Sequence, residues 1–291
     1  MLREWSEFIN KVREFFLGRG YLEVSTPILL SFPNLDSNVE PISVSVRERG
    51  KLKRLWLQTS PEYSMKKLLS KYGEHMFQIA KVFRNDEWGR FHRIEFHMLE
   101  FYRVGADYNY LMEELGDLLA EVLGGDEPEH ITVEEAFRKY FGEPIPKETT
   151  ALLRLLREKG IYCRADEDWE TLFYRALIEI ERELGREKPT FLRDYPASLC
   201  ALAKVREGVA ERFELFIEGV EIANGWTEEI EPAEVRRRLM KESVKRKLPV
   251  DEEFIKAHES MPKCAGCSVG LDRLFMFYIG KDSLEGIELL S

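Results

Sequence analysis

The stretch "FRNDEWGRFHRIEFHMLEFYR", residues 83–103, decides the fold that we expect for this chain. An apolar run ends at Arg84, a charged loop with one glycine follows, and a second run alternates between apolar and hydrogen-bonding residues. This pattern predicts two strands joined by the loop. Because strand side chains alternate between the faces of a sheet, four of them share one face: Phe96, Met98, Glu100 and Tyr102. Glu100 and Tyr102 have no use in a purely apolar core, so this face predicts a pocket in which Arg84 binds an anion and Glu100 a cation.

The composition is typical of a globular protein, since 44% of the 291 residues are hydrophobic and 33% are charged. No apolar stretch approaches the length of a membrane span, and the N-terminus lacks the apolar segment of a signal peptide, so we expect a cytoplasmic protein that does not enter membranes. The net charge of −10 disfavours a large nucleic-acid-binding surface. A lone C-x-x-C pair, Cys264 and Cys267, indicates ordinary thiols, because a structural zinc ion needs four ligands.

Helical and strand patterns alternate along the chain. Apolar residues at helical spacing predict helices over residues 3–18 and 107–124, and a third helix with Ser60 as its N-cap. Residues 125–188 are helical in pattern, charge-rich and free of strand patterns, so we interpret them as an inserted helical subdomain. Strand patterns on both sides of it predict one α+β domain over residues 1–291, with a mostly antiparallel sheet flanked by helices. The glycine-rich motifs of Rossmann and P-loop nucleotide sites are absent from the sequence.

A second candidate site lies in "ERFELFIEGVEIANGWTEE", residues 211–229. A two-residue turn at Glu218 and Gly219 makes this stretch a hairpin. Glu214 and Glu221 are then diagonal neighbours on one face, about 7–8 Å apart at the backbone. Carboxylates at this spacing fit Mg²⁺, which prefers oxygen ligands and substrate phosphates, but a solvated sheet face explains them equally well.

A third candidate site lies in "GCSVGLDRLFMF", residues 266–277. A short strand ends at Gly270 and a helix begins near Leu271, so Arg273 lies in the first turn of that helix. A helix N-terminus favours anions, which makes a bound phosphate a better explanation for this arginine than a structural role. An ion pair with Asp272 is the alternative.

Four motifs together carry a resemblance to a known family: "TSPEYSMKKLL", "FRNDEWGRFHRIEFHMLEFY", "GVEIANGWTEE" and "GCSVGLDRLFM". The chain resembles the catalytic domain of class II lysyl-tRNA synthetases and, more closely, their tRNA-free paralogues that attach lysine to elongation factor P. The resemblance covers nearly the whole chain. It implies a class II synthetase-like domain, a homodimer, and the use of ATP and Mg²⁺ to form an aminoacyl-adenylate. It also implies lysine or β-lysine as the substrate and an elongation factor P-like protein as the acceptor.

The resemblance assigns roles around ATP. Arg84 matches the arginine that bridges the α-phosphate and the amino acid carboxylate, and Arg273 matches the arginine on the γ-phosphate, so these two are the candidate catalytic residues. Glu214 and Glu221 match the carboxylates that hold Mg²⁺. Five further residues match contacts of the nucleotide: Asn85, Asp86, Phe91, His92 and Gly270.

The resemblance also assigns residues to the amino acid substrate. Glu62 matches the carboxylate near the α-amino group, although a favourable charge at a helix N-terminus also explains it. Tyr102 and Glu228 match the residues that hold the side-chain ammonium, with Glu100 in the same pocket, and Asn224 matches the contact of the carboxylate. The remaining candidates for substrate binding are Ser60, Trp226 and Ser268.

The chain departs from the family pattern at several positions. Arg93 and Ile94 replace an Asn-Pro pair, which leaves the ATP contact there open. Ser268 replaces a glycine of the synthetases and an alanine of the paralogues, so the choice between α-lysine and β-lysine stays open. Trp226 replaces a phenylalanine and keeps an aromatic wall.

Two alternatives to a lysine ligase remain. One is an amino acid-activating enzyme of another specificity, such as an archaeal-type asparagine synthetase, although Glu100, Tyr102 and Glu228 suit an ammonium group better than an aspartate side chain. The other is a truncated or non-catalytic lysyl-tRNA synthetase paralogue, although Arg84 and Arg273 are both present. Because the first predicted helix starts at residue 3, we expect no anticodon-binding domain.

The resemblance also makes a geometric demand. Glu221 and Asn224 are three residues apart, so regular alternation puts them on opposite faces, whereas the resemblance requires both in one site. We therefore predict an irregularity within residues 223–225, where Gly225 tolerates the backbone angles of a bulge.

Overall fold

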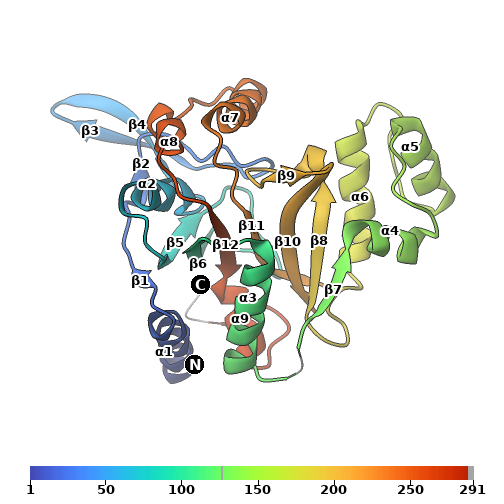
Figure 1. The fold of residues 1–291 in the computed structure, drawn as a ribbon, viewed down its shortest axis with the longest axis horizontal. Helices are drawn as coiled ribbons and strands as arrows, with labels where there is room; N and C mark the ends of the chain where they lie inside the picture. Colours follow the sequence, from blue (N-terminus) through green and yellow to red (C-terminus); the bar gives the residue numbers. More distant parts are fainter. Residues whose placement is uncertain (126, 288–291) are drawn as a thin grey trace. The chain divides into compact units, whose positions relative to one another are not determined.

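The computed structural model describes residues 1–125 and 127–287 (Figure 1). The chain divides into two compact units, of which the first comprises Met1–Gly125 and Gly225–Ser291 and the second comprises Asp126–Asn224. Strand β11 (Val220–Thr227) begins in the second unit and ends in the first. The first unit is therefore built from two segments of the chain, one before and one after the second unit in the sequence.

The first unit contains four strands of the larger sheet, paired in the order β1-β5-β6-β12, and β12 pairs in turn with β11. Their bounds are Leu22–Glu23 for β1, Met76–Phe83 for β5, Glu95–Val104 for β6 and Cys264–Gly270 for β12. β6 pairs antiparallel with β5 and with β12, whereas β1 runs parallel to β5. The predicted strand pair of residues 83–103 is thus confirmed as β5 and β6, and so is the mostly antiparallel α+β architecture.

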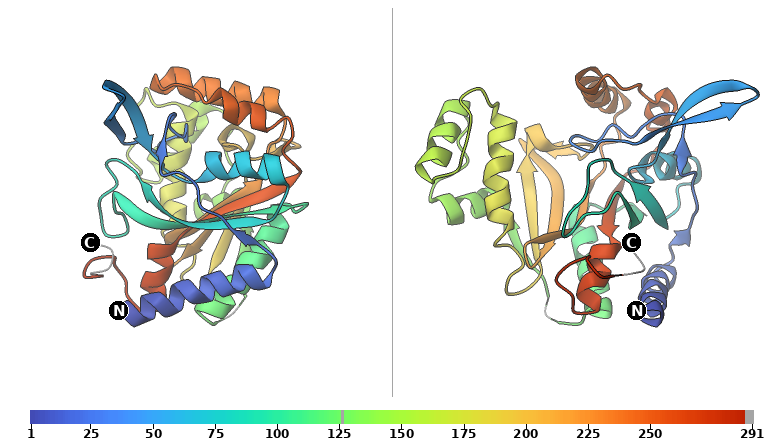
Figure 2. Two further views of the ribbon diagram at one scale, coloured as in Figure 1. Left: turned by 90° about the vertical axis from the view of Figure 1, so that its left-hand side faces the viewer. Right: turned by 180° about the vertical axis from the view of Figure 1, so that it is seen from behind.

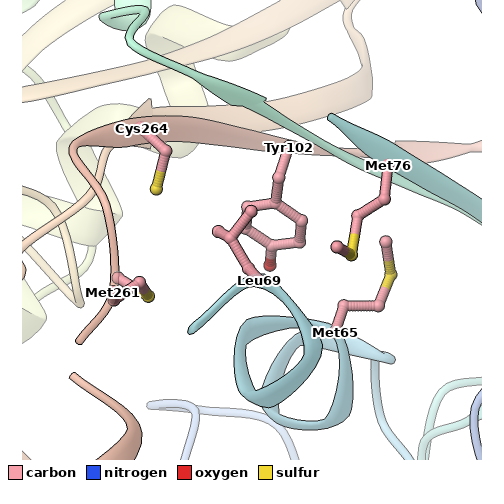
Figure 3. Packing of buried hydrophobic residues seen from close by; sticks show 6 residues of the cluster. All are labelled: Met65, Leu69, Met76, Tyr102, Met261 and Cys264. Atoms are coloured by element: carbon pink, nitrogen blue, oxygen red, sulfur yellow. The ribbon is translucent and has the colours of Figure 1, made fainter. Parts of the chain in front are cut away.

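Helices cover both faces of this sheet (Figure 2). The helices of the first unit are α1 (Leu2–Gly18), α2 (Glu62–Tyr72), α3 (Tyr108–Val122), α7 (Pro232–Arg246), α8 (Glu252–Ala257) and α9 (Leu271–Tyr278). Phe16 of α1 packs against Phe77 of β5 and Phe101 of β6, with ring centroids 5.2 and 4.8 Å apart. Helix α2 lies on the opposite face, where an apolar cluster joins it to the sheet (Figure 3): Met65, Leu69, Met76, Tyr102, Met261 and Cys264. The sheet is therefore the middle of three layers.

A smaller sheet completes the first unit, in the order β2-β4-β3. It consists of β2 (Leu29–Leu30), β3 (Ser43–Glu48) and β4 (Lys51–Leu57). β3 and β4 form an antiparallel hairpin whose end projects from the unit (Figure 1). Most side chains of this hairpin are exposed, so it contributes little to the core.

The second unit combines three helices with short strands. Its elements are β7 (Glu129–Thr132), α4 (Val133–Phe141), α5 (Thr149–Glu158), α6 (Trp169–Glu181), β8 (Thr190–Pro196), the 3-10 turn η1 (Ala197–Leu199), β9 (Val205–Arg206) and β10 (Val209–Ile217). The strand order is β10-β8-β7, with β9 beside β10. The helices predicted within residues 125–188 are present. The prediction that this segment contains no strand is wrong, because β7 pairs parallel with β8 over four residues.

Several local predictions are confirmed. Glu218 and Gly219 form the turn between β10 and β11, with φ of 51° and 75°, the positive values that a tight two-residue hairpin turn requires. All four cysteines are free thiols and buried. Among the described residues, the helices are all too short or too polar to cross a membrane.

Candidate functional site

The register of β6 with its neighbours shows which side chains share the predicted face. Glu100 lies opposite Gln78 of β5 and Ser268 of β12, and Tyr102 lies opposite Gly266 of β12. Directly paired residues of antiparallel strands share a face, so these side chains belong to one surface. That surface is the one that α2 covers.

Glu100 and Tyr102 are buried and joined to each other. The Tyr102 hydroxyl donates a hydrogen bond of 2.6 Å to Oε1 of Glu100. Burial, together with the charge of Glu62, raises the pKa of Glu100 well above its usual value. Its other oxygen, Oε2, has no hydrogen-bond partner within residues 1–125 and 127–287. A cationic ligand would supply the missing donor.

Helix α2 brings Glu62 to this surface. The helix begins at Glu62, and its N-cap position is Pro61, so the predicted cap at Ser60 is wrong by one residue. The proline ring sets the backbone for the first turn, while Ser60 still helps, because its Oγ accepts from the Glu62 N–H at 3.4 Å. Ser60 Oγ also accepts from the amide of Asn34 at 3.2 Å.

Lys66 of α2 is a member of the site that the sequence did not reveal. Its side chain is 0% exposed, and its Nζ lies 2.5 Å from Oε1 of Glu62 and 2.6 Å from Oε2 of Glu228. Burial alone would lower the pKa of this ammonium, but the charges of Glu228 and Glu62 raise it above its usual value. Lys66 is therefore a permanent cation between two buried carboxylates.

Glu228 directly follows strand β11, and its side chain is buried beside Lys66. The indole N–H of Trp226 donates to its Oε2 at 2.9 Å, which shows that the two side chains, two residues apart, point the same way. Burial raises the pKa of Glu228 to about 7, although Lys66 pulls it down. Its second oxygen, Oε1, lacks a hydrogen-bond partner in the part of the chain that the structure describes.

Gly266 is needed for the close approach of Tyr102 and Glu228. A Cβ atom on this residue would lie 2.3 Å from the Tyr102 ring and 2.7 Å from Oε1 of Glu228. Both distances are shorter than any ordinary contact. A glycine inside a strand often marks such an approach, and this was the signal in the sequence that could have identified the position.

Arg84 directly follows β5, one residue beyond the end of the strand, whereas the sequence pattern put it at the last strand position. Its guanidinium lies 5.3 Å from the centre of the Phe96 ring, and Phe96 belongs to the pocket face of β6. The Nε atom donates to the Thr59 carbonyl at 3.4 Å, and Glu87 lies 3.7 Å from the guanidinium. The side chain is about a quarter exposed, so it is accessible to a ligand.

The loop between β5 and β6 carries the other predicted ATP contacts. Asn85 and Asp86 are exposed, and Asp86 has a φ of +59°. His92 is exposed and forms a short bridge with Gly89. Arg93, which departs from the family pattern, donates to the carbonyls of Gly89 and His92 at 2.6 and 2.8 Å. Arg93 therefore stabilises the conformation of this loop through hydrogen bonds to the loop's own backbone.

Arg273 ties this loop to the first turn of α9. Its Nε atom donates to the carbonyl of Phe91 at 3.0 Å, and Gly270 occupies the N-cap position of the helix. Asp272 faces another group, since its Oδ1 lies 2.9 Å from Nδ1 of His97. The structure thus brings Phe91, Gly270 and Arg273 together.

The second unit contains a separate cluster of charges around Arg212. This buried arginine donates to Glu214 at 2.6 Å and to the side-chain oxygen of Asn224 at 3.2 Å. Arg212 and Glu214 are two residues apart on β10, so Asn224 reaches the side of Glu214. Residues 222 and 223 are both buried, but β11 is one continuous strand over Val220–Thr227, and the register shift that the structure shows lies in β10, between Ala210 and Phe213. The irregularity within residues 223–225 therefore stays a prediction.

Three carboxylates of this cluster repel one another. Burial and the charges of Glu214 and Glu221 raise the pKa of Glu181 to about 8. Burial also raises the pKa of Glu214 to about 7, against the opposing effect of Arg212. Within the described chain, no three acidic, histidine or cysteine side chains gather closely enough to hold a metal ion by themselves. A cation at Glu214 and Glu221 would need additional oxygen ligands, such as phosphates.

The predicted site residues are thus distributed between the units. Glu214, Glu221 and Asn224 lie in the second unit, whereas all the other predicted residues lie in the first. Neither Lys66 nor the two cluster residues Arg212 and Glu181 were predicted. The joint action of both sets on one substrate stays a prediction.

Comparisons with known proteins show what the whole chain is similar to. A family model described as class II tRNA synthetases (D, K and N) matches residues 1–290. A protein of Aquifex aeolicus (strain VF5) named elongation factor P–(R)-beta-lysine ligase homolog is 65% identical over 284 residues, which cover 98% of this chain and 97% of that protein. The elongation factor P–(R)-beta-lysine ligase of Vibrio cholerae is 36% identical over 302 residues, with 98% and 93% covered. That of Haemophilus influenzae is 36% identical over 296 residues, with 97% and 92% covered.

Proposed function

Because the chain belongs to the class II tRNA synthetase family (D, K and N), and within it to the group of elongation factor P–(R)-β-lysine ligases, we propose that it is an ATP-dependent ligase for β-lysine or lysine. It activates the amino acid as an aminoacyl-adenylate. It then transfers the aminoacyl group to a lysine side chain of elongation factor P or a similar protein.

The observation that carries this proposal is a pair of buried carboxylate oxygens, Oε2 of Glu100 and Oε1 of Glu228, which lack donors among the described residues. Tyr102 is close to both residues, since its hydroxyl donates to Oε1 of Glu100 and a Cβ atom on Gly266 would meet both its ring and Oε1 of Glu228. A buried charged acceptor without a hydrogen-bond donor costs roughly several kcal/mol of desolvation free energy, and a bound ammonium group removes that cost. The side-chain ammonium of a lysine-type substrate fits here, with the rings of Tyr102 and Trp226 as walls.

The other substrate groups follow from this anchor. Glu62 receives the second amino group, and Asn224 receives the carboxylate. The Ser60 hydroxyl accepts a hydrogen bond from the backbone N–H of Glu62 and so supports that residue. Ser268, opposite Glu100 in the sheet, narrows the pocket. A substrate with a carboxylate side chain would meet repulsion from Glu100 and Glu228, which disfavours an asparagine synthetase.

The first chemical step is adenylate formation. A carboxylate oxygen of the amino acid attacks the α-phosphorus of ATP, the bond to the β-phosphate breaks, and pyrophosphate leaves. The Arg84 guanidinium neutralises the negative charge that develops on the α-phosphate. Arg273 holds the γ-phosphate, and five residues position the nucleotide: Asn85, Asp86, Phe91, His92 and Gly270.

The acidic cluster of the second unit fits a magnesium ion by its donors. Glu214 and Glu221 offer the oxygen ligands that Mg²⁺ prefers. Burial, and to a smaller extent the neighbouring carboxylates, raises the pKa values of Glu181 and Glu214, and a cation nearby would favour their ionised forms. When bound there with ATP, Mg²⁺ neutralises phosphate charge. Arg212 holds Glu214 and Asn224 in place for this task.

The second step is aminoacyl transfer. The neutral amine of the acceptor lysine attacks the carbonyl carbon of the adenylate, a C–N bond forms, and the C–O bond to AMP breaks. The attacking nitrogen loses one proton and AMP departs. No nucleophile of this chain is required. We propose (R)-β-lysine as the preferred substrate because the relatives carry it in their names. A homodimer and a cytoplasmic location remain part of the proposal.

The test is pyrophosphate exchange into ATP with a panel of (R)-β-lysine, L-lysine, ornithine, norleucine and aspartate. We expect exchange with (R)-β-lysine first and L-lysine second, and background rates with norleucine and aspartate. Intact-mass spectrometry of elongation factor P should then show the gain of one aminoacyl group. Exchange with aspartate, or exchange without any transfer to the protein, would overturn the substrate or the acceptor respectively.

A further inference from the structure

Lys66 has no role in the reaction described so far. It lies one helical turn after Glu62 on α2, and its side chain is fully buried. Its ammonium bonds to Glu62 and to Glu228 at 2.5 and 2.6 Å. One buried cation thus joins the two carboxylates to which the proposed function assigns the two amino groups of the substrate.

A packing role explains this lysine poorly. Burying an ionised pair costs about as much as the pair returns, and apolar replacements are often equally stable. Met65 and Leu69, on the same helix, already supply the apolar packing against Tyr102 (Figure 3). The benefit of Lys66 must therefore come from its effect on the carboxylates.

The bonds of Lys66 leave the substrate's acceptors open. On Glu228, both Lys66 and Trp226 occupy Oε2, and Oε1 remains without a donor from the described residues. On Glu62, Lys66 occupies Oε1. Glu228 is thus held by one oxygen while its other oxygen is available to a ligand.

We propose that Lys66 is a positioning residue that gives the pocket its specificity for substrates with two ammonium groups. This inference rests on the proposed function. Three carboxylates, Glu62, Glu100 and Glu228, surround one resident ammonium, so the pocket retains two negative charges when all four groups are ionised. A diamino acid supplies the two matching positive charges. Lys66 also fixes the separation of Glu62 and Glu228, and with it the spacing at which two amino groups are bound.

Removal of this cation changes the pocket in a defined way. Without Lys66, Glu62 and Glu228 lose their shared partner and repel each other. At least one of them then takes up a proton or turns away. The pocket loses affinity for the diamino acid, whereas the ATP contacts at Arg84 and Arg273 stay as they are.

The experiment compares Lys66→Met with Lys67→Met. Lys67 is the neighbouring lysine of the same helix, a third exposed, and its ion pair goes to Asp251 at 2.6 Å, so its loss controls for removal of a helix lysine. Calorimetry measures binding of (R)-β-lysine and of L-lysine, and pyrophosphate exchange measures KM for the amino acid and for ATP. We expect Lys66→Met to weaken the better diamino acid at least tenfold with KM for ATP changed less than twofold, and Lys67→Met to change neither.

A second pair of variants covers the case in which Lys66→Met does not fold. Glu62→Gln combined with Lys66→Met removes the cation together with one partner and keeps buried charge closer to balance. This double variant should bind the diamino acid at least tenfold more weakly than Glu62→Gln alone, because Glu228 loses the ammonium group that holds its carboxylate in place. Equal binding in either comparison overturns the role of Lys66 and leaves the proposed function standing. A wild-type protein that neither binds nor activates a diamino acid overturns both.

Discussion

The Tyr102 hydroxyl and Oε1 of Glu100 form a hydrogen bond of 2.6 Å inside a surface where both side chains are buried. This bond orients the carboxylate so that Oε2 faces the pocket without a donor from the described residues. Glu100 is therefore aimed at its ligand by its neighbour in the same strand.

Tyr102→Phe should weaken the amino acid substrate and leave ATP unaffected. A hydrogen bond to a charged group contributes about 1.5–3 kcal/mol, so KM for β-lysine or lysine should rise roughly ten- to a hundredfold. Steady-state pyrophosphate exchange gives both constants. Tyr72→Phe, at an exposed ring of α2, is the control and should match the wild type. A similar rise of KM for ATP would show that the bond supports the whole site and not one ligand.

Gly266→Ala should abolish amino acid activation. The new methyl group would lie 2.3 Å from the Tyr102 ring and 2.7 Å from Glu228, so one of them must move out of the ligand position. We expect a fall in kcat/KM for the amino acid of at least about a hundredfold, since small displacements of binding groups have such effects. Gly18→Ala is the matched control, because a Cβ there meets nothing within 4 Å. Normal activity of Gly266→Ala would show that the close approach does not exist in solution.

The affinity for the diamino acid should depend on pH through Glu228. Its pKa is raised to about 7, and only the ionised carboxylate attracts an ammonium group. Below that pH the group is neutral, so affinity falls as the pH falls. Between about pH 8 and about pH 6, KM for the amino acid should rise roughly five- to tenfold. KM for ATP, measured in the same series, should not follow this titration. A flat profile for the amino acid would exclude Glu228 as its ligand.

Glu181→Gln should stabilise the protein at alkaline pH. The pKa of Glu181 is raised to about 8 in the folded protein, from 4.5 when unperturbed. The folded state therefore holds a proton that the unfolded state has lost, and the unfolding free energy falls as the pH rises from about 4.5 to about 8. Glutamine removes this penalty, so the substitution should raise the unfolding free energy by about 1–3 kcal/mol at pH 8 and by close to nothing at pH 4. Urea unfolding at the two pH values measures the difference.

The control for this prediction is Glu179→Gln on the same helix. Glu179 is partly exposed and paired with Arg182 at 3.0 Å, so its loss should change the unfolding free energy by less than about 0.5 kcal/mol at either pH. An equal gain from both substitutions would mean that general acidity of the surface, and not burial of Glu181, causes the effect.

Arg84→Ala and Arg273→Ala should both remove adenylate formation without unfolding the protein. Loss of one group that stabilises developing charge typically costs about a hundred- to a thousandfold in rate. Arg273 also bonds to the Phe91 carbonyl, so its loss should loosen the nucleotide loop and raise KM for ATP, whereas Arg84→Ala should act mainly on kcat. Circular dichroism confirms the fold. Unchanged exchange rates in either variant would contradict the assigned role.

Alternation along β6 is the reason why Glu100 and Tyr102 could be assigned to one face from the sequence. A strand places every second side chain on the same side whatever surrounds it, and the register with β5 and β12 follows this rule. Lys66 could not be found in this way. In the run that contains Lys66 and Lys67, both are ordinary lysines of a helix, and the packing of α2 on the sheet alone decides which of them is buried.

Long-range pairing also explains what the sequence failed to indicate in the second unit. Strand β7 has four residues and pairs with β8 across the three helices, so it has no local pattern of its own. Glu181 closes an amphipathic helix, where a glutamate normally faces solvent. Its contact with the charges of Glu214 and Glu221 comes from elements that are distant in the sequence.

The positions of the two cysteines on strand β12 determine whether a disulfide can form within this strand. Cys264 pairs with Val104 and Cys267 with Phe101, so the two thiols project from opposite faces of the sheet. A disulfide requires Cβ atoms about 3.5–4.5 Å apart on facing side chains, which this strand cannot provide. Burial and the nearby charge of Glu228 raise the pKa of Cys264, which keeps it as an unreactive thiol. The strand that carries Gly266 and Ser268 therefore holds the same geometry in oxidising and in reducing surroundings, and the enzyme needs no reductant to keep its substrate pocket intact.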